Sequence, residues 1–341
     1  MSTASVDPSG KPQPESFKRL IWSNVSHSPL RSLWDLQGIS LMTILKRTAH
    51  SFQEDNLLSR AAELGYYFLF ALFPTLLSAS SIFGLFARSQ HDFYPKLLNY
   101  LSLVVPPSAL GIVLETFNQT AKASSGGKFV FGLAAALWAA SVGFTAIQDT
   151  LNIVYKVRET RPYWKVRGAA MLVTLLLAIV ITIALFTLFA GDFTAHFLSL
   201  RIPQHMLSLA VAISIRTVAW VVTTALLMLI FAIIYYYAPD VRNKTWHWLT
   251  PGAAVGIFFW IAASVVLRLY LHYFNSYSLT YGSLGAVIIL LTWFYITGLM
   301  LLLGAEFNSE IAAAVLEKNL KERGELPPHA TANEAAPIQA A

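Results

Sequence analysis

The sequence of 341 residues contains no cysteine, and few of its residues carry a charge. The missing thiols exclude disulfides, thiolate zinc sites, iron–sulfur clusters and cysteine nucleophiles. Charged residues make up 12% of the chain and hydrophobic residues 56%, with a mean hydropathy of +0.56. A typical soluble domain carries about twice that share of charge. Most of this chain must therefore be buried or solvated by lipid.

Motifs of catalysis and cofactor binding are also missing. The eight histidines are scattered, and no two share one helix at the i, i+4 spacing of a zinc site. The patterns HExxH, GxSxG, GxGxxG and the Walker A loop do not occur. Asp and Glu are too sparse to supply the converging carboxylates of a two-metal nuclease. We therefore expect no catalytic residue, no metal and no cofactor, and a protein that is not an enzyme.

The sequence contains long apolar runs. About 20 apolar residues are needed to cross the hydrocarbon core as a helix, and six runs of this kind occur. The sequence therefore predicts an all-α, polytopic membrane protein with a six-helix transmembrane bundle. The predicted spans are 64–86, 129–147, 169–190, 209–238, 249–271 and 283–305.

The segments around this 61–308 transmembrane domain differ from it in composition. Residues 1–36 are rich in Pro, Ser and charge, which predicts a disordered cytoplasmic tail. Over 37–60 apolar residues recur at helical spacing, which predicts an amphipathic helix on the inner membrane surface. A helix packed on the protein's own cytoplasmic face fits that pattern equally well. For 309–341 we expect a cytoplasmic tail that is largely disordered.

The loop over 87–128 is the one long connection on the outer side. Its apolar residues fall at helical spacing before and after Pro106 and Pro107. This pattern predicts an extracytoplasmic helical hairpin that packs on the outer mouth of the bundle or enters the interface.

The distribution of Lys and Arg predicts the orientation of the spans. Seventeen of these residues flank the spans on the side of both termini and five flank them on the opposite side. Because Lys and Arg concentrate in cytoplasmic loops, we expect both termini in the cytoplasm. The basic balance is thus a topology signal, and we expect no nucleic acid as a partner.

Ionisable residues in or beside the spans are the candidate site residues, because hydrocarbon penalises charge. Arg216 and Arg268 are expected toward the outer end, where guanidinium groups suit phosphate headgroups. Asp149 and Glu306 are expected at the inner end, together with Glu63. We regard Arg216, Arg268, Asp149 and Glu306 as a hypothetical substrate-binding set.

Structural interpretations of the same residues remain open. The arginines can snorkel to the headgroups or pair near the interface. The inner acids can pair with Arg60 or Arg158, or they can couple to a cation or a proton. Small residues favour close helix contacts, notably the GxxxG of Gly252 and Gly256, although a ligand-admitting hinge near 281–285 is the alternative.

Eight blocks of the chain resemble the YihY/BrkB family of bacterial inner-membrane proteins. They are Arg60 to Tyr67, Leu72 to Pro74, Trp138 to Phe144, Tyr235 to Pro239, Leu249 to Ala253, Tyr281 to Gly285, Leu290 to Tyr295 and Gly304 to Asn308. At Glu63 the family more often has a small apolar residue. The resemblance implies a six-span protein of the bacterial inner membrane.

The resemblance implies no settled reaction. Members of the family were long labelled ribonuclease BN, and others are linked to serum resistance and to envelope lipid phenotypes. Three hypotheses follow. In the first, a transporter-like protein binds or moves an anionic lipid or another amphiphile in the bilayer. In the second, a scaffold docks envelope proteins through its outer hairpin. In the third, the protein is a tRNA-processing ribonuclease. We expect the first, and the sequence does not determine the oligomeric state.

Overall fold

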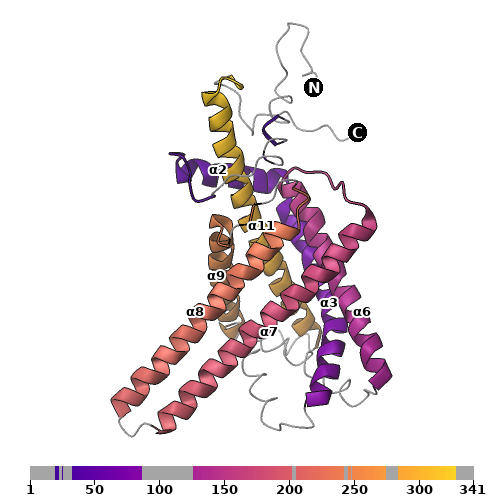
Figure 1. The fold of residues 1–341 in the computed structure, drawn as a ribbon, viewed down its shortest axis with the longest axis vertical. Coiled ribbons are helices and arrows are strands. Elements are labelled where there is room, and N and C mark those ends of the chain that lie inside the picture. Colours follow the sequence, from indigo (N-terminus) through magenta and orange to yellow (C-terminus); the bar gives the residue numbers. More distant parts are fainter. Residues whose placement is uncertain are drawn as a thin grey trace.

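The computed structural model describes residues 20–22, 25, 33–86, 126–201, 205–241, 245–246, 248–273 and 283–327. In this part of the chain the regular elements are long α-helices (Figure 1). They are α2 (Leu41–Glu54), α3 (Leu57–Phe86), α6 (Gly126–Val154), α7 (Tyr163–Arg201), α8 (His205–Tyr237), α9 (Pro251–Tyr273) and α11 (Ser283–Glu322). The predicted outer hairpin and most of residues 1–36 lie outside the described residues.

Four of the described helices are long and apolar enough to cross a membrane. The protein itself buries only 11% to 33% of their most apolar stretches. Apolar surface left uncovered to this extent requires a lipid solvent, because soluble proteins rarely expose large contiguous apolar patches. These helices contain the third to sixth predicted spans, within Tyr163–Ser199, Met206–Tyr237, Pro251–Tyr273 and Leu284–Glu322.

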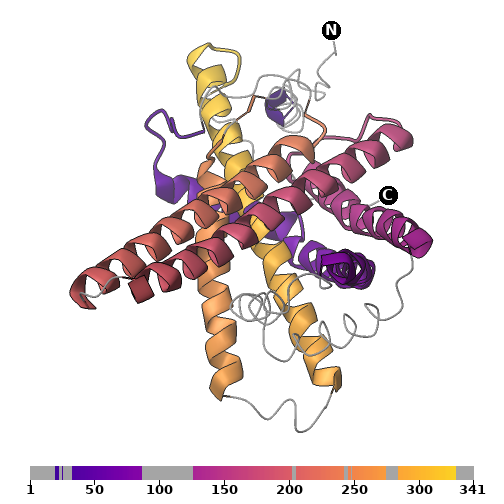
Figure 2. The same cartoon turned by 60° about the horizontal axis from the view of Figure 1, so that its bottom comes forward.

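Helix α11 lies at the centre of the arrangement. It contacts α3 and α9 along its length, and it also contacts α2 and α6. Helices α3 and α6 lie side by side, and α7 and α8 form a second pair that crosses the others obliquely (Figures 1 and 2). The pair α7–α8 diverges from α9 toward one end of the molecule, as both views show.

The C-terminal end of α11 extends into the predicted tail. We predicted that 309–341 is largely disordered, whereas the helix continues to Glu322, so the first part of that tail is helical. Ile311 in this extension is buried against Ile44 of α2. The hydrophobic run ends where charged residues begin, but Glu, Lys, Ala and Leu all favour a helix, so the helix does not end there.

Helix α2 packs on the protein through one face and exposes apolar residues on another. Ser40 caps its N-terminus by accepting from the Met42 amide at 3.3 Å. Ile44 on the inward face is buried against α11. Leu41, Met42 and Leu45 are exposed on a second, apolar face. The helix therefore packs on the protein and still presents an apolar stripe outward.

Glycines bring α9 and α11 into backbone contact. A Cβ on Gly252 would overlap the carbonyl oxygen of Gly304, and one on Gly256 would lie 2.9 Å from the Met300 carbonyl oxygen. Tyr235 of α8 closes the same contact by donating to the Leu301 carbonyl at 2.8 Å. This confirms the packing interpretation of the GxxxG pattern, since no side chain larger than hydrogen fits there.

Candidate functional site

The helix ends and turns that carry most of the described charges meet at one end of the molecule, here called the polar end. It includes Asp55 between α2 and α3, the α6–α7 turn from Tyr155 to Pro162, Asp240 after α8, and residues 306–322 of α11. Long-range hydrogen bonds join these segments. Asp240 accepts from the Thr160 amide and hydroxyl at 2.8 and 2.6 Å, and its own amide donates to Asn152 at 2.7 Å.

The α6–α7 turn contains a strong ion pair. Arg161 donates to Glu159 at 2.8 and 2.7 Å and to the Ala238 carbonyl at 3.1 Å, and Asn152 donates to Glu159 at 3.0 Å. Burial alone would raise the pKa of the Glu159 carboxyl, but the donors from Arg161 and Asn152 outweigh it and lower this pKa to about 2. The same contact raises the pKa of Arg161. Glu159 therefore remains ionised and anchors the turn.

A second network joins α2 to α11. Arg47 donates to Glu310 at 3.1 Å and to Glu317 at 3.0 Å. Ser51 donates to Glu310 at 2.6 Å, and Lys321 donates to Glu317 at 2.9 Å. Glu310 is completely buried. Arg47 and Lys321 thus neutralise the buried acids Glu310 and Glu317. A buried charge is tolerated when an opposite charge and hydrogen bonds offset its desolvation.

Lys156 and Asp55 form a third ion pair, which links the α6–α7 turn to the break between α2 and α3. Lys156 terminates α6 with φ +52°, in the left-handed region. Glycine usually occupies this position because a Cβ is strained there, and Gly324 does so after α11 with φ +72°. Lys156 therefore adopts this backbone conformation although a side chain disfavours it, and its ammonium group pairs with Asp55.

Glu306 lies among these groups on α11. The charges of Asp55, Glu310 and Lys156 act on it, and Glu306 in turn acts on the Tyr155 phenol. Its side chain is completely buried, and neither carboxyl oxygen has a hydrogen-bond partner. On α6, Gln148 is also completely buried, and its amide nitrogen and oxygen have no partner either. Such groups are rare in proteins and indicate a bound species or a functional role.

Asn308 is a site residue that the sequence reasoning did not single out. Its side-chain oxygen accepts from the Gly252 amide at 2.8 Å, and its nitrogen donates to Thr250 at 3.0 Å. It thereby supplies a partner for a free amide at the start of α9. The sequence did point to these residues, because Asn308 and Thr250 lie in two of the blocks that carry the family resemblance.

Asp149 and Glu306 were both expected at the inner end, but they differ in burial: Asp149 is exposed, whereas Glu306 is buried. Glu63, Glu159 and Arg161 act on Asp149 electrostatically. Glu63 itself pairs with Arg60 at 3.1 Å on the exposed surface of α3. The structure thus gives Glu63 one of the predicted structural partners.

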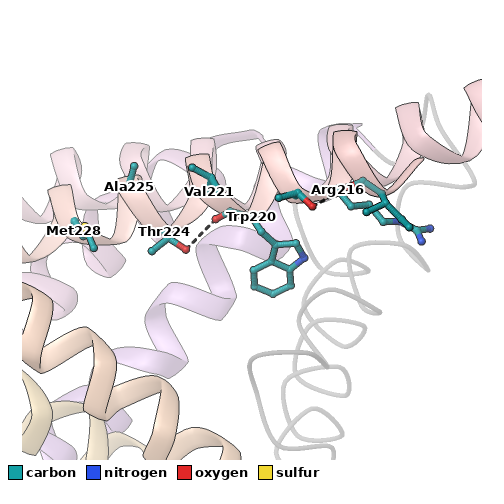
Figure 3. A pocket seen from close by; sticks show the side chains of 8 residues that line it. Arg216, Trp220, Val221, Thr224, Ala225 and Met228 are labelled. Carbon is teal, nitrogen blue, oxygen red and sulfur yellow. Dashed lines mark hydrogen bonds between the residues drawn. The ribbon is translucent and has the colours of Figure 1, made fainter. Parts of the chain in front are cut away.

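Arg216 borders a groove of about 620 Å³ on the surface of α8 (Figure 3). Apart from Arg216, the groove is lined by apolar residues and by threonines such as Thr217 and Thr224, whose hydroxyls donate to carbonyls of their own helix at 2.9 Å. Among the described lining residues, Arg216 is the charged one. The described lining residues are Ile213, Arg216, Thr217, Trp220, Val221, Thr224, Ala225 and Met228.

Arg216 is also an ion-pair partner of α7. Its Nε donates to Asp192 at 3.0 Å, and both side chains are about half exposed, at 55% and 48%. Arg268 is exposed near the other end of α9 from the GxxxG contact. The two arginines belong to different helices, Arg216 to α8 and Arg268 to α9, and these helices diverge toward one end of the molecule (Figures 1 and 2).

The described residues contain no group of three His, Asp or Glu side chains able to hold a metal ion. His247 lies outside them, whereas Asp149 is exposed and Glu306 is buried.

Comparison with known proteins gives a consistent family assignment. The family model described as virulence factor BrkB matches residues 48–327. The Bacillus subtilis protein named ribonuclease-like protein YfkH is 34% identical over 271 residues, which cover 80% of this chain and 94% of that protein.

Two further relatives are named UPF0761 membrane proteins. One from Stenotrophomonas maltophilia is 27% identical over 284 residues, and one from Xanthomonas oryzae is 26% identical over 275 residues. Each match covers 77% of this chain and 59% of the relative, so the chain spans about three fifths of their length. No solved structure matches the chain.

Proposed function

The chain belongs to the BrkB family of membrane proteins, and on that basis we propose that it binds an anionic lipid, or an amphiphile like it, and moves it through the membrane. The observation that carries this proposal is the groove on α8, which combines an apolar lining with one guanidinium group. An amphiphile with an acyl chain and a phosphate head needs both features.

The dimensions of the groove suit a lipid chain. Its lining extends from Arg216 to Met228, twelve residues farther along α8, or about 18 Å at 1.5 Å per residue (Figure 3). This is more than half of the hydrocarbon core, which is about 30 Å thick. An acyl chain seated there, with its head at Arg216, would span one leaflet and reach past the midplane.

Arg216 can bind a headgroup without losing its protein partner. Asp192 accepts from Nε, which leaves the two terminal nitrogens of the guanidinium to a phosphate. Asp192 also reduces the cost of a cation beside the hydrocarbon. In this proposal Arg268 is a second headgroup contact on α9, and Asp149 and Glu306 act at the inner end.

The proposal includes a membrane topology. Six helices cross the bacterial inner membrane, namely α3, α6, α7, α8, α9 and α11, and both termini lie in the cytoplasm. It is supported by the polar end, where the basic α6–α7 turn, α2 and the last part of α11 meet (Figure 1). The protein acts as a non-enzymatic carrier or binder of amphiphiles rather than as a nuclease.

Transbilayer movement of labelled lipids in liposomes with the full-length protein tests this proposal. We expect faster movement of an anionic lipid than in protein-free liposomes, and at least a tenfold loss, about 1.4 kcal/mol, with Arg216→Ala. Asp192→Asn is the matched control, because it breaks the same ion pair but keeps the guanidinium. Movement as slow as in empty liposomes, or an equal loss in both variants, would contradict the proposal.

A further inference from the structure

Glu306 differs from every other buried acid of the polar end. Glu310 has Arg47 and Ser51 as partners, at 3.1 and 2.6 Å. Glu306 lies one helical turn earlier on the same helix and is equally buried, yet neither of its oxygens has a partner. Glu310 therefore has hydrogen-bond partners for its carboxylate, whereas Glu306 has none.

Among the described residues, the bases near Glu306 are already paired with other acids. Arg47 and Lys321 compensate the two buried acids farther along α11, Glu310 and Glu317. Lys156 compensates Asp55. An ionised Glu306 would add a buried charge with no compensating partner, which proteins avoid because desolvation of such an ion is costly.

We propose that Glu306 is a proton-binding site. The carboxyl carries a proton while Lys156 pairs with Asp55. When the proton leaves to water at the polar end, the Lys156 ammonium shifts from Asp55 toward the new carboxylate. A proton needs a single oxygen, whereas a metal cation needs several oxygen ligands, and the described residues contain no group of three His, Asp or Glu side chains placed to hold one.

The charged groups that act on this site come from α2, from the α6–α7 turn and from α11 itself. Asp55 and Glu54 face it from the end of α2, Lys156 and Tyr155 from the α6–α7 turn, and Glu310 from α11 itself. Lys156 holds its left-handed backbone at this place. Because Asp55 lies at the break before α3, proton release would loosen the junction between α2 and α3. This inference stands independently of the lipid hypothesis.

Infrared difference spectroscopy of the full-length protein in lipid nanodiscs tests the inference. At pH 7 we expect a carboxylic C=O band that is present in the wild type and absent from Glu306→Gln. Glu310→Gln is the matched control and should leave that band in place. Glu306→Gln should melt at the wild-type temperature or above, whereas Glu310→Gln should melt at least about 5 °C lower.

Lys156→Met provides a second arm that does not depend on the folding of the glutamate variants. Without the ammonium, the pH at which the band disappears should rise by about one unit or more. An absent band at pH 7, an unchanged midpoint in Lys156→Met, or a melting temperature that rises with sodium in the wild type and not in Glu306→Gln would overturn the proton site.

Discussion

Glu159 shows at the scale of a single residue how the α6–α7 turn is stabilised. Its folded pKa of about 2 lies below the ordinary value of 4.5. A group with a lowered folded pKa stabilises the fold above its ordinary pKa, and this contribution is lost as pH falls through the folded value. The ion pair with Arg161 should therefore act fully above about pH 4.5 and disappear toward pH 2.

We predict that Glu159→Gln lowers the melting temperature of the detergent-solubilised protein at pH 7, and that the difference from wild type shrinks as the pH falls from 4.5 toward 2. Glu63→Gln is the comparison, because its exposed pair with Arg60 should contribute about 0–1 kcal/mol. A difference from wild type that stays constant over that pH range would rule out the assigned role of Glu159.

At the scale of helices, the contact between α9 and α11 depends on the absence of side chains. Gly252→Ala forces a methyl group against the Gly304 carbonyl. Overpacking typically costs about 1–3 kcal/mol, and here the obstacle is backbone, which cannot rotate away. We predict a loss of stability at or above the upper end of that range, measured by unfolding in mixed micelles.

Gly168→Ala is the control for that measurement. Gly168 lies in α7, where an added Cβ has nothing within 4 Å. Alanine should stabilise this helix by up to about 1 kcal/mol because of its better helix propensity. The opposite signs of the two substitutions distinguish close packing from a general effect of glycine replacement.

The outward face of α2 yields a second prediction for an element. Leu45 is 51% exposed, and an amphipathic helix at the interface would bury such a residue in lipid. The chain has no cysteine, so a fluorophore on Leu45→Cys is attached at a single position. Lipids with nitroxide groups below the headgroups should quench it strongly. A label on His50→Cys, on the polar side of α2, should be quenched weakly, and equal quenching would place α2 off the membrane.

At the scale of the whole molecule, the polar end and the opposite end should lie on different sides of the membrane. We predict that a membrane-impermeant maleimide added to intact cells labels Ser199→Cys, near the end of α7, and does not label Glu325→Cys, after α11. Both should react after the cells are opened. The reverse pattern would invert the topology, and labelling of both in intact cells would exclude the three crossings proposed between the two positions, α8, α9 and α11.

The candidate site was predictable in part. Arg216 and Glu306 stood out in the sequence because ionisable groups in or beside apolar runs are uncommon. The ion pairs did not stand out, since Asp192 and Arg216 are 24 positions apart, and Arg47 and Glu310 are 263 apart. The left-handed backbone of Lys156 also escaped prediction, because glycine is the usual signal for that conformation.

The sequence by itself determined the helices and which of their ends carry basic residues. Both are local properties, since the length of an apolar run and the charges beside it are read from consecutive residues. Only the tertiary structure decided that α11 continues to Glu322 against α2, that Glu310 has partners and that Glu306 has none. Ion pairs and burial depend on how segments that are distant in the sequence pack together, and this packing cannot be read from consecutive residues.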